Sequence, residues 1–253
     1  MDNLPDEILL RIFSFLHFME RILLRTVSRR WSNLMYDRTL LEQISLSRNY
    51  SEDRKLSSLF AAAKKLVAVD LLNCRFLDGS CVLLGGLSRL RRLNLSGTRV
   101  TDGILQSILK ASKELEELHL VDTEISESCI PEIVALKKLH YIGFPPEGVS
   151  GFGRNGVLSV VKACPTLRVL DCQEGYFFTH EDIMEIMRNN CLFSTLLIPY
   201  AFVDNSTFAV IVDSLQSLTY ICVCETNVSQ ECVDEIKNRR PRLNICWNVN
   251  HTP

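Results

Sequence analysis

The sequence predicts an α/β fold: a solenoid curved into a horseshoe, with parallel strands on the concave face and helices on the convex face. Three observations predict it. A six-residue apolar pattern recurs through most of the 253 residues, helix-start residues lie between its copies, and residues 1–47 show helical periodicity instead. One strand–helix unit cannot bury its own apolar edge, so the copies must stack. We therefore expect a helical domain at 1–47 and a repeat array at 48–253.

The N-terminal segment, residues 4–31, is predicted to be helical. Pro5 suits the first helical position, where its missing N–H costs nothing. Asp6 and Glu7 place negative charge at the positive end of the helix dipole. The apolar face that follows consists of Ile8, Leu9, Ile12, Phe13 and Leu16. Ser28 can cap a third short helix, whose shared face consists of Val27, Trp31, Leu34 and Met35.

Such a short helical segment cannot enclose a sizeable core alone. It is therefore either a cap on the repeats or a docking module whose spare apolar surface belongs to a partner.

The residues of this segment resemble an F-box from Leu4 to Ile44. The matching residues are Leu4-Pro5, Glu7, Ile8, Ile12-Phe13, Leu16, Val27 and Arg29-Arg30-Trp31. Leu40-Leu41 replaces the usual Leu-Trp, and His17-Phe18 replaces common acidic or proline residues. The resemblance implies a three-helix domain that binds the S-phase kinase-associated adaptor protein and, through it, the cullin of SCF (Skp–cullin–F-box) ubiquitin ligases.

The resemblance gives seven residues the role of adaptor binding or of packing the helical domain, and the sequence leaves the division between these roles open. They are Leu4, Pro5, Ile8, Phe13, Leu16, Val27 and Trp31.

The repeated pattern is L-x-x-L-x-L, and Leu41-Ile44-Leu46 predicts a first short strand before it. Its copies are Leu66-Val69-Leu71, Leu90-Leu93-Leu95, Leu115-Leu118-Leu120, Leu139-Ile142-Phe144, Leu167-Leu170-Cys172, Phe193-Leu196-Ile198, Leu218-Ile221-Val223 and Leu243-Cys246-Asn248. Their starts are 24, 25, 24, 28, 26, 25 and 25 residues apart. In the last copy Asn248 replaces an apolar residue, which is typical of a C-terminal capping repeat.

Helix-start residues follow the strands at equivalent places. Thr101-Asp102 begins one helix, and Ser126, His180-Glu181-Asp182, Asp204 and Ser229 recur at the same position. With Ala163-Cys164-Pro165-Thr166-Leu167, these segments resemble cysteine-containing leucine-rich repeats. The resemblance implies that Cys74, Cys164 and Cys191 are buried structural thiols. It also places Thr98, Thr123 and Thr226 in the small polar position after the strand.

The repeat that starts at Leu139 is the longest, with 28 residues to the next start, and contains Gly151-Phe152-Gly153-x-x-Gly156. The motif lacks the βαβ context and acidic partner of a dinucleotide site. We expect an enlarged loop beside the binding face, with Phe152 at its tip in contact with a ligand protein.

Charge and hydropathy exclude several classes. A net charge of −2 argues against a nucleic-acid-binding protein. The arginines of the N-terminal segment, including Arg38, are expected to solvate its helices. No apolar run is long enough for a membrane span, and acidic N-terminal residues do not suit a signal peptide. We expect a cytoplasmic or nuclear protein, or both.

The cysteines and histidines give little support for catalysis. None of the ten cysteines lies before Cys74, and their spacing does not suit a disulfide framework. Cys222 and Cys224 are one residue apart, but no second pair or histidine motif completes a zinc site. His119 lies about four repeats from Cys222, too far for a nucleophile–base pair. We expect no enzyme activity, no metal and no cofactor.

The residues between the inward leucines should face the concave surface. The first half of this surface is charged and polar, and the last repeats are apolar and aromatic. We hypothesise that Tyr220 and Trp247 anchor a target protein, since such residues commonly anchor interfaces. Arg92, Glu117 and His119 would set its orientation. Tyr141 also lies on this face, as do Ile245 and Trp247 of the last copy. The alternative for Trp247 is that it seals the last repeat.

These features predict the substrate-recognition subunit of an SCF-type E3 ubiquitin ligase, which binds the adaptor through the F-box and a target through the repeats. The alternative is a non-catalytic repeat protein that binds or inhibits its target outside a ligase, as ribonuclease-inhibitor-type horseshoes do. A third interpretation, an enzyme with a cysteine nucleophile, requires a hyper-reactive thiol.

Overall fold

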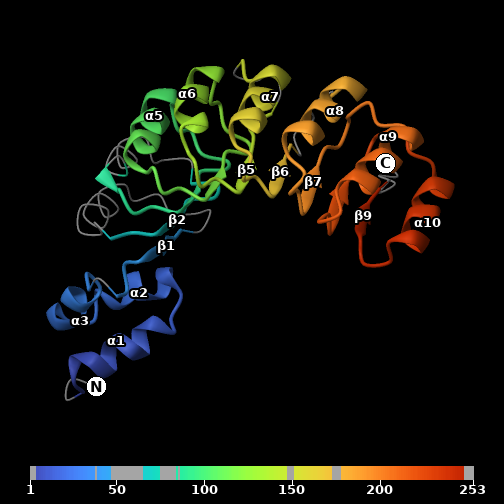
Figure 1. Ribbon diagram of the computed structural model, residues 1–253. Helices are drawn as coiled ribbons and strands as arrows, with labels where there is room; N and C mark the ends of the chain where they lie inside the picture. Colours follow the sequence, from blue (N-terminus) through green and yellow to red (C-terminus); the bar gives the residue numbers. More distant parts are fainter. Residues whose placement is uncertain are drawn as a thin grey trace, which may run out of the picture. The chain divides into compact units, whose positions relative to one another are not determined.

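The structure, a computed structural model, describes residues 4–37, 39–46, 65–74, 84, 86–146, 151–172 and 178–247. It divides into two compact units, Met1–Leu115 (unit 1) and Glu116–Pro253 (unit 2) (Figure 1). Among the described residues, no helix is long and apolar enough to cross a bilayer. The domain boundary at residue 47 stays a prediction.

Unit 1 begins with three short helices, α1 (Asp6–Ser14), α2 (Phe18–Leu24) and α3 (Arg29–Leu34). Pro5 is the residue before α1, one position earlier than predicted. The Ser28 hydroxyl accepts a hydrogen bond from the Trp31 N–H, as predicted (3.1 Å). Val27 precedes α3 and is exposed, so it does not share the buried face of that helix.

A small core holds the three helices together. It consists of Leu9, Phe13, Trp31, Met35 and Leu40. The rings of Phe13 and Trp31 meet edge to face with their centroids 4.9 Å apart, a favoured aromatic geometry. The core therefore joins α1 to α3 and to the segment that leads into the first strand.

The arginines of the helical domain form contacts between its elements, in addition to solvating its helices. Arg30 donates to the Asp6 carboxylate at 2.6 Å and links α3 to the start of α1. Arg21 donates to the Leu40 carbonyl at 2.6 Å, and the Arg25 guanidinium lies 4.8 Å from the centre of the Tyr36 ring. Arg38 lies outside the described residues.

The strands of unit 1 are β1 (Gln43–Ser45), β2 (Ala68–Asp70) and β3 (Arg92–Asn94), followed by helix α5 (Asp102–Ala111). They pair in parallel in chain order, with the inward residues Ile44, Val69 and Leu93 in register. β1 confirms the predicted strand before the first full repeat.

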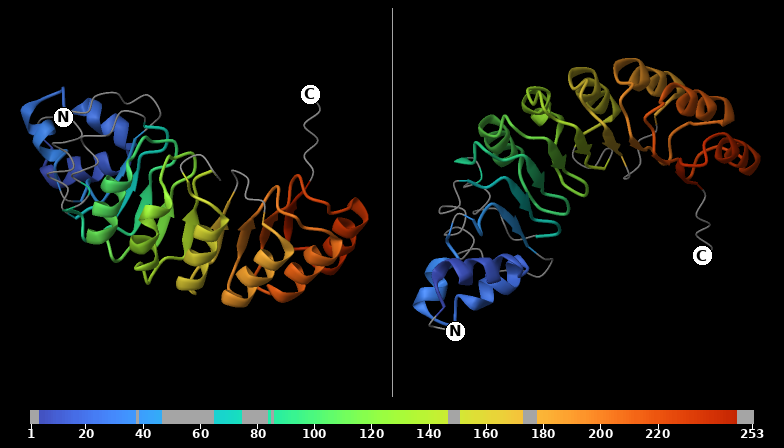
Figure 2. Two further views of the ribbon diagram at one scale, coloured as in Figure 1. Left: turned by 90° about the horizontal axis from the view of Figure 1, so that it is seen from above. Right: turned by 60° about the horizontal axis from the view of Figure 1, so that its bottom comes forward.

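Unit 2 alternates strands and helices. Its elements are β4 (Glu117–His119), η2 (Glu127–Cys129), α6 (Ile130–Val134), β5 (Tyr141–Gly143), α7 (Arg154–Ala163), β6 (Val169–Asp171), α8 (His180–Asn189), β7 (Thr195–Leu197), α9 (Asn205–Ser214), β8 (Tyr220–Cys222), α10 (Gln230–Arg239) and β9 (Asn244–Cys246). The strands pair in parallel in chain order, and the helices lie on one side of them (Figure 2). The predicted leucine-rich-repeat solenoid with an N-terminal helical domain is confirmed.

In the last repeat, the strand register differs from the predicted one by one residue. Ile221 lies opposite Ile245, and Cys222 lies opposite Cys246. One residue separates Leu243 from the inward residue Ile245, whereas two residues separate Leu218 from the inward residue Ile221. A shift of one residue moves side chains to the other face of a strand. The prediction that Ile245 and Trp247 face the concave surface is therefore wrong, and Cys246 faces it instead.

In several repeats, the turn that follows the strand contains one residue in the left-handed backbone conformation. Positive φ occurs at Asn73 (60°), Gly97 (67°), Asp122 (53°), Tyr200 (62°) and Glu225 (56°). Glycine, asparagine and aspartate adopt this conformation readily, whereas bulky residues rarely do. The threonines predicted at the small polar position then close the turn, as Thr98 does by donating to the Leu95 carbonyl (2.6 Å).

The glycine-rich segment before α7 is a packing feature. A Cβ at Gly156 would lie 2.9 Å from Glu127 Oε1, and Gly153 donates its N–H to the same oxygen at 3.1 Å. Phe152 is fully buried, and its ring centroid lies 5.5 Å from that of Phe144. The prediction that Phe152 contacts a ligand protein is wrong, because its ring fills the core. Residues 147–150 of the predicted loop lie outside the described residues.

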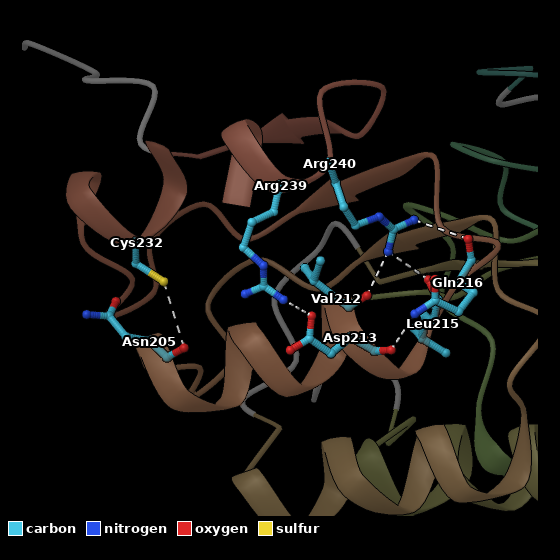
Figure 3. A network of polar contacts seen from close by, with 8 residues as sticks. All are labelled: Asn205, Val212, Asp213, Leu215, Gln216, Cys232, Arg239 and Arg240. Atoms are coloured by element: carbon cyan, nitrogen blue, oxygen red, sulfur yellow. Dashed lines mark hydrogen bonds and ion pairs between the residues drawn. The ribbon is translucent and has the colours of Figure 1, made fainter. Parts of the chain in front are cut away.

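Side chains cap both ends of α9. The Asp204 carboxylate accepts a hydrogen bond from the Thr207 N–H at the N-terminus (2.8 Å). At the C-terminus, the Arg240 guanidinium donates to the carbonyls of Val212, Leu215 and Gln216 at 2.6–3.2 Å (Figure 3). It also donates to the Leu218 carbonyl at 2.7 Å. Arg240 thereby satisfies carbonyls that the helix leaves unpaired and places positive charge at the negative end of its dipole.

Candidate functional site

The helical domain of unit 1 exposes large apolar side chains around its buried core. They are Ile8 (45% exposed), Ile12 (40%), Phe15 (81%), Leu23 (69%) and Val27 (58%), named here the exposed apolar set. Ile8, Ile12 and Phe15 are four and three residues apart and form a stripe along α1. Leu9 and Phe13 form a second, buried stripe.

The structure divides the seven residues that the F-box resemblance singled out. Phe13 and Trp31 are buried in the core, and Leu4 and Leu16 are partly buried against it. Pro5, Ile8 and Val27 are exposed. These three are the most accessible of the seven to a partner.

Sequence reasoning missed Phe15 and Leu23, the two most exposed members of the set. The available signal was the second apolar stripe of α1, since a helix of nine residues in a small domain cannot bury two stripes. Such an exposed apolar group is typical of a protein–protein interface.

A polar and aromatic group lies on the predicted concave face of unit 2. The Tyr141 hydroxyl donates to Asp171 Oδ2 at 2.8 Å. The His119 ring stacks on Tyr141 with centroids 4.0 Å apart, and His119 Nε2 lies 4.0 Å from Glu117 Oε2. Strand pairing thus brings Glu117, His119 and Tyr141 together, as predicted from their shared face.

Burial and charge fix the state of this group. Burial raises the pKa of Tyr141, and the Asp171 carboxylate raises it further, so Tyr141 stays a neutral donor at physiological pH. A Cβ at Gly143 would approach a Val121 methyl to 3.0 Å and the Asp171 carboxylate to 3.6 Å. The small residue therefore leaves room for the Val121 side chain beside the buried acid. Hydrogen-bonding groups and a ring face suit binding, and none of these groups forms a nucleophile–base pair.

The other predicted target-binding residues lie in separate places. Arg92 is exposed on β3 of unit 1. Tyr220 is 37% exposed on β8. Trp247 follows β9 and donates its indole N–H to the Val228 carbonyl at 2.7 Å, which anchors it to the last turn.

The cysteines divide into buried and accessible groups. Cys74 and Cys164 are buried, as predicted, but Cys191 is exposed. Asn190 takes the inward position in its place and donates to the Leu167 carbonyl at 2.7 Å. Cys222, Cys224 and Cys246 bring their sulfurs within 4.8 Å of one another. The sequence argument against a metal site was that no further ligand accompanies Cys222 and Cys224. Cys246, from the neighbouring strand, supplies a third sulfur.

Comparisons with known proteins support both parts of the chain. Residues 1–47 match the family model described as F-box-like. Residues 28–144 match a model of the leucine-rich repeats of FBD-associated F-box proteins.

Solved structures share the fold. They include the internalin InlF of Listeria monocytogenes (TM-score 0.53, 13% identity, 85% of this chain and 65% of that chain) and its internalin C2 (0.51, 14%, 83% and 84%). A chain of the Rad7–Elc1 complex of yeast matches with a TM-score of 0.64, 19% identity, and 85% and 57% coverage. Identities this low show the fold alone. This chain spans less than two thirds of the InlF chain and of the yeast chain.

The residues matched by the two family models include the three-helix domain and the first strands of the parallel solenoid. The chain is therefore an F-box/leucine-rich-repeat protein, with an F-box-like domain followed by leucine-rich repeats.

Proposed function

We propose that this protein is the substrate-recognition subunit of an SCF-type E3 ubiquitin ligase, acting in the cytoplasm, the nucleus or both. The F-box-like domain binds the S-phase kinase-associated adaptor protein, and the repeats bind a target. The exposed apolar set carries the proposal, because it gives the F-box-like domain a surface that a partner must cover.

The exposed apolar set is large enough to contribute much of the binding free energy of a specific complex. Fully burying one large apolar side chain stabilises by roughly 1.5–3 kcal/mol, and the five members are 40–81% exposed in this chain. Covering them contributes on the order of 4–8 kcal/mol before the costs of association. A micromolar complex requires about 8 kcal/mol. The set therefore supplies much of the required free energy, and a charge within it should weaken binding measurably.

The repeats supply the target-binding surface in this proposal. Glu117, His119 and Tyr141 form one candidate contact region, and a cationic or hydrogen-bonding segment of the target suits its carboxylate and stacked rings. Tyr220 supplies a separate exposed aromatic, and Arg92 a charge in unit 1. The protein acts by proximity: it raises the effective concentration of the target near a conjugating enzyme and carries out no bond chemistry itself.

Co-purification with the adaptor and cullin tests the proposal. The wild type should elute as a stoichiometric complex with both, and the Ile8→Asp/Phe15→Asp variant should elute without them. Leu192→Asp, which charges an exposed leucine of unit 2 (44% exposed), is the matched control and should keep the complex. A folded wild type that captures neither partner would favour the alternative, a repeat protein that binds its target outside a ligase.

A further inference from the structure

Three cysteine thiols meet on the concave side of the last two strands of unit 2. The sulfurs of Cys222 and Cys224 are 3.5 Å apart, and those of Cys224 and Cys246 are 3.3 Å apart. All three lie within 4.8 Å of one another. Cys222 is the last residue of β8, Cys224 lies in the turn two residues later, and strand pairing places Cys246 opposite Cys222. We name these residues the thiol cluster.

Core packing does not account for the thiol cluster. Cys74, Cys129, Cys164 and Cys172 are buried, as expected of cysteines that serve as small apolar side chains. The three members of the cluster are only partly buried, beside the exposed ring of Tyr220. A position on the solvent-facing side of the strands requires another explanation.

The geometry suits a single metal ion. Metal–sulfur bonds of about 2.3 Å at tetrahedral angles hold the sulfurs about 3.8 Å apart. The observed separations of 3.3 and 3.5 Å, with an upper bound of 4.8 Å for the set, bracket this distance. Rotation of the thiols about their side-chain bonds is enough to reach it.

Outer contacts and access also suit a metal site. The Cys222 thiol donates to the Cys224 sulfur at 3.5 Å, and Tyr220 lines the same groove as Cys246. Groups next to the ligands orient them and tune their affinity for a metal. A groove of about 490 Å³, lined by Tyr220, Lys237 and Cys246 among other residues, provides a route from solvent.

We propose that Cys222, Cys224 and Cys246 bind one soft d¹⁰ cation, Cu⁺ or Zn²⁺, through three thiolates. Thiolate sulfur selects these ions over harder cations. Among the described residues the site offers three ligands. This number suits three-coordinate Cu⁺, or Zn²⁺ with water or a target side chain in the fourth position.

Metal titrations of the reduced, full-length chain test the proposal. In one arm Co²⁺ stands in for Zn²⁺ and reports through thiolate-to-cobalt charge-transfer absorption, with Zn²⁺ then displacing it. In the other arm Cu⁺ is titrated against a Cu⁺-selective chelator. We expect saturation at one equivalent in at least one arm, and the arm that saturates identifies the ion.

Variants decide where the metal binds. Cys222→Ser/Cys224→Ser/Cys246→Ser should lose the saturable binding, and the single variant Cys246→Ser should weaken it at least about tenfold. Cys232→Ser removes a thiol on α10 that lies outside the cluster and should bind like the wild type. Circular dichroism checks the fold, and Cys246→Ser keeps the test valid if the triple variant misfolds. No saturable binding in either arm, or equal binding by the folded triple variant, would overturn the proposal.

Discussion

Trp31 and Val27 are four residues apart, and both belong to the F-box motif, yet their environments are opposite. Trp31 is 7% exposed and packs against Phe13, whereas Val27 is 58% exposed. Motif membership therefore covers two roles: some residues build the F-box-like domain and others form its outer surface. The two apolar stripes of α1 indicate that one of them is exposed but not which one, because Ile8 and Leu9 are adjacent and similarly apolar and lie on different faces of the helix.

Trp31→Ala should destabilise unit 1 by about 3–5 kcal/mol, because it removes a buried ring and leaves a cavity. Val27→Ala should change the free energy of unfolding by less than about 0.5 kcal/mol. Chemical denaturation followed by circular dichroism measures both. Equal effects of the two substitutions would contradict the assigned burial.

Tyr200 carries backbone strain that a substitution can relieve. Its φ of 62° lies in the left-handed region, which costs roughly 1–2 kcal/mol for an ordinary side chain. Tyr200→Asn should therefore stabilise the protein by up to about 1 kcal/mol, since asparagine tolerates this conformation. A thermal melt measures the change, and a lower melting temperature would show that contacts of the ring outweigh the strain.

At the scale of elements, α9 depends on its two caps. The sequence predicted the N-terminal one, because Asp204 precedes an apolar helix at the repeated position. It could not predict the C-terminal one, because Arg240 comes from the end of the next helix and reaches four carbonyls only once the repeats stack. Local signals predict local contacts, and stacking creates the others.

Arg240→Met should destabilise the last repeats by about 2–3 kcal/mol, because it removes charge-assisted hydrogen bonds and leaves carbonyls unpaired. Arg242→Met alters a nearby exposed arginine and should have little effect. Hydrogen exchange of α9 amides localises the loss. Unchanged protection of α9 in Arg240→Met would contradict the capping role.

Asp204 should make the stability of α9 sensitive to acid. The Thr207 N–H lowers the pKa of the Asp204 carboxyl from 3.8 to about 2. Because the folded pKa is lower, the stabilisation is complete above about pH 4 and is lost as the pH falls toward 2. Asp204→Ala should cost about 1 kcal/mol at neutral pH, measured by denaturation.

Asp204→Asn keeps an acceptor for the Thr207 N–H and should stay close to the wild type at pH 7, without this acid-dependent loss. A steep acid dependence in Asp204→Asn equal to that of the wild type would show that other carboxylates control it.

The last strand shows the limit of pattern recognition at this scale. Spacing placed the earlier strands correctly, and the inward residues of β4–β8 fall in register as predicted. In β9 a turn shortened by one residue moved Cys246 to the concave face. The three thiols could therefore not be grouped from their sequence spacing.

At the scale of the whole molecule, the two family matches and the fold give the chain an F-box-like domain followed by an array of leucine-rich repeats. The sequence predicted this architecture well, because periodicity and the F-box motif are properties of the chain itself. It could not identify which side chains are left for partners, since Phe15 is exposed and Phe152 is buried only through packing. The central claim is that the exposed apolar set forms the adaptor interface.

Calorimetric titration of the adaptor into the purified protein tests this claim most directly. Phe15→Asp should weaken adaptor binding at least about tenfold, equivalent to about 1.4 kcal/mol, while Leu192→Asp should bind like the wild type. Equal dissociation constants for the wild type and a folded Phe15→Asp variant would contradict the claim and place the adaptor, if it binds, elsewhere on the chain.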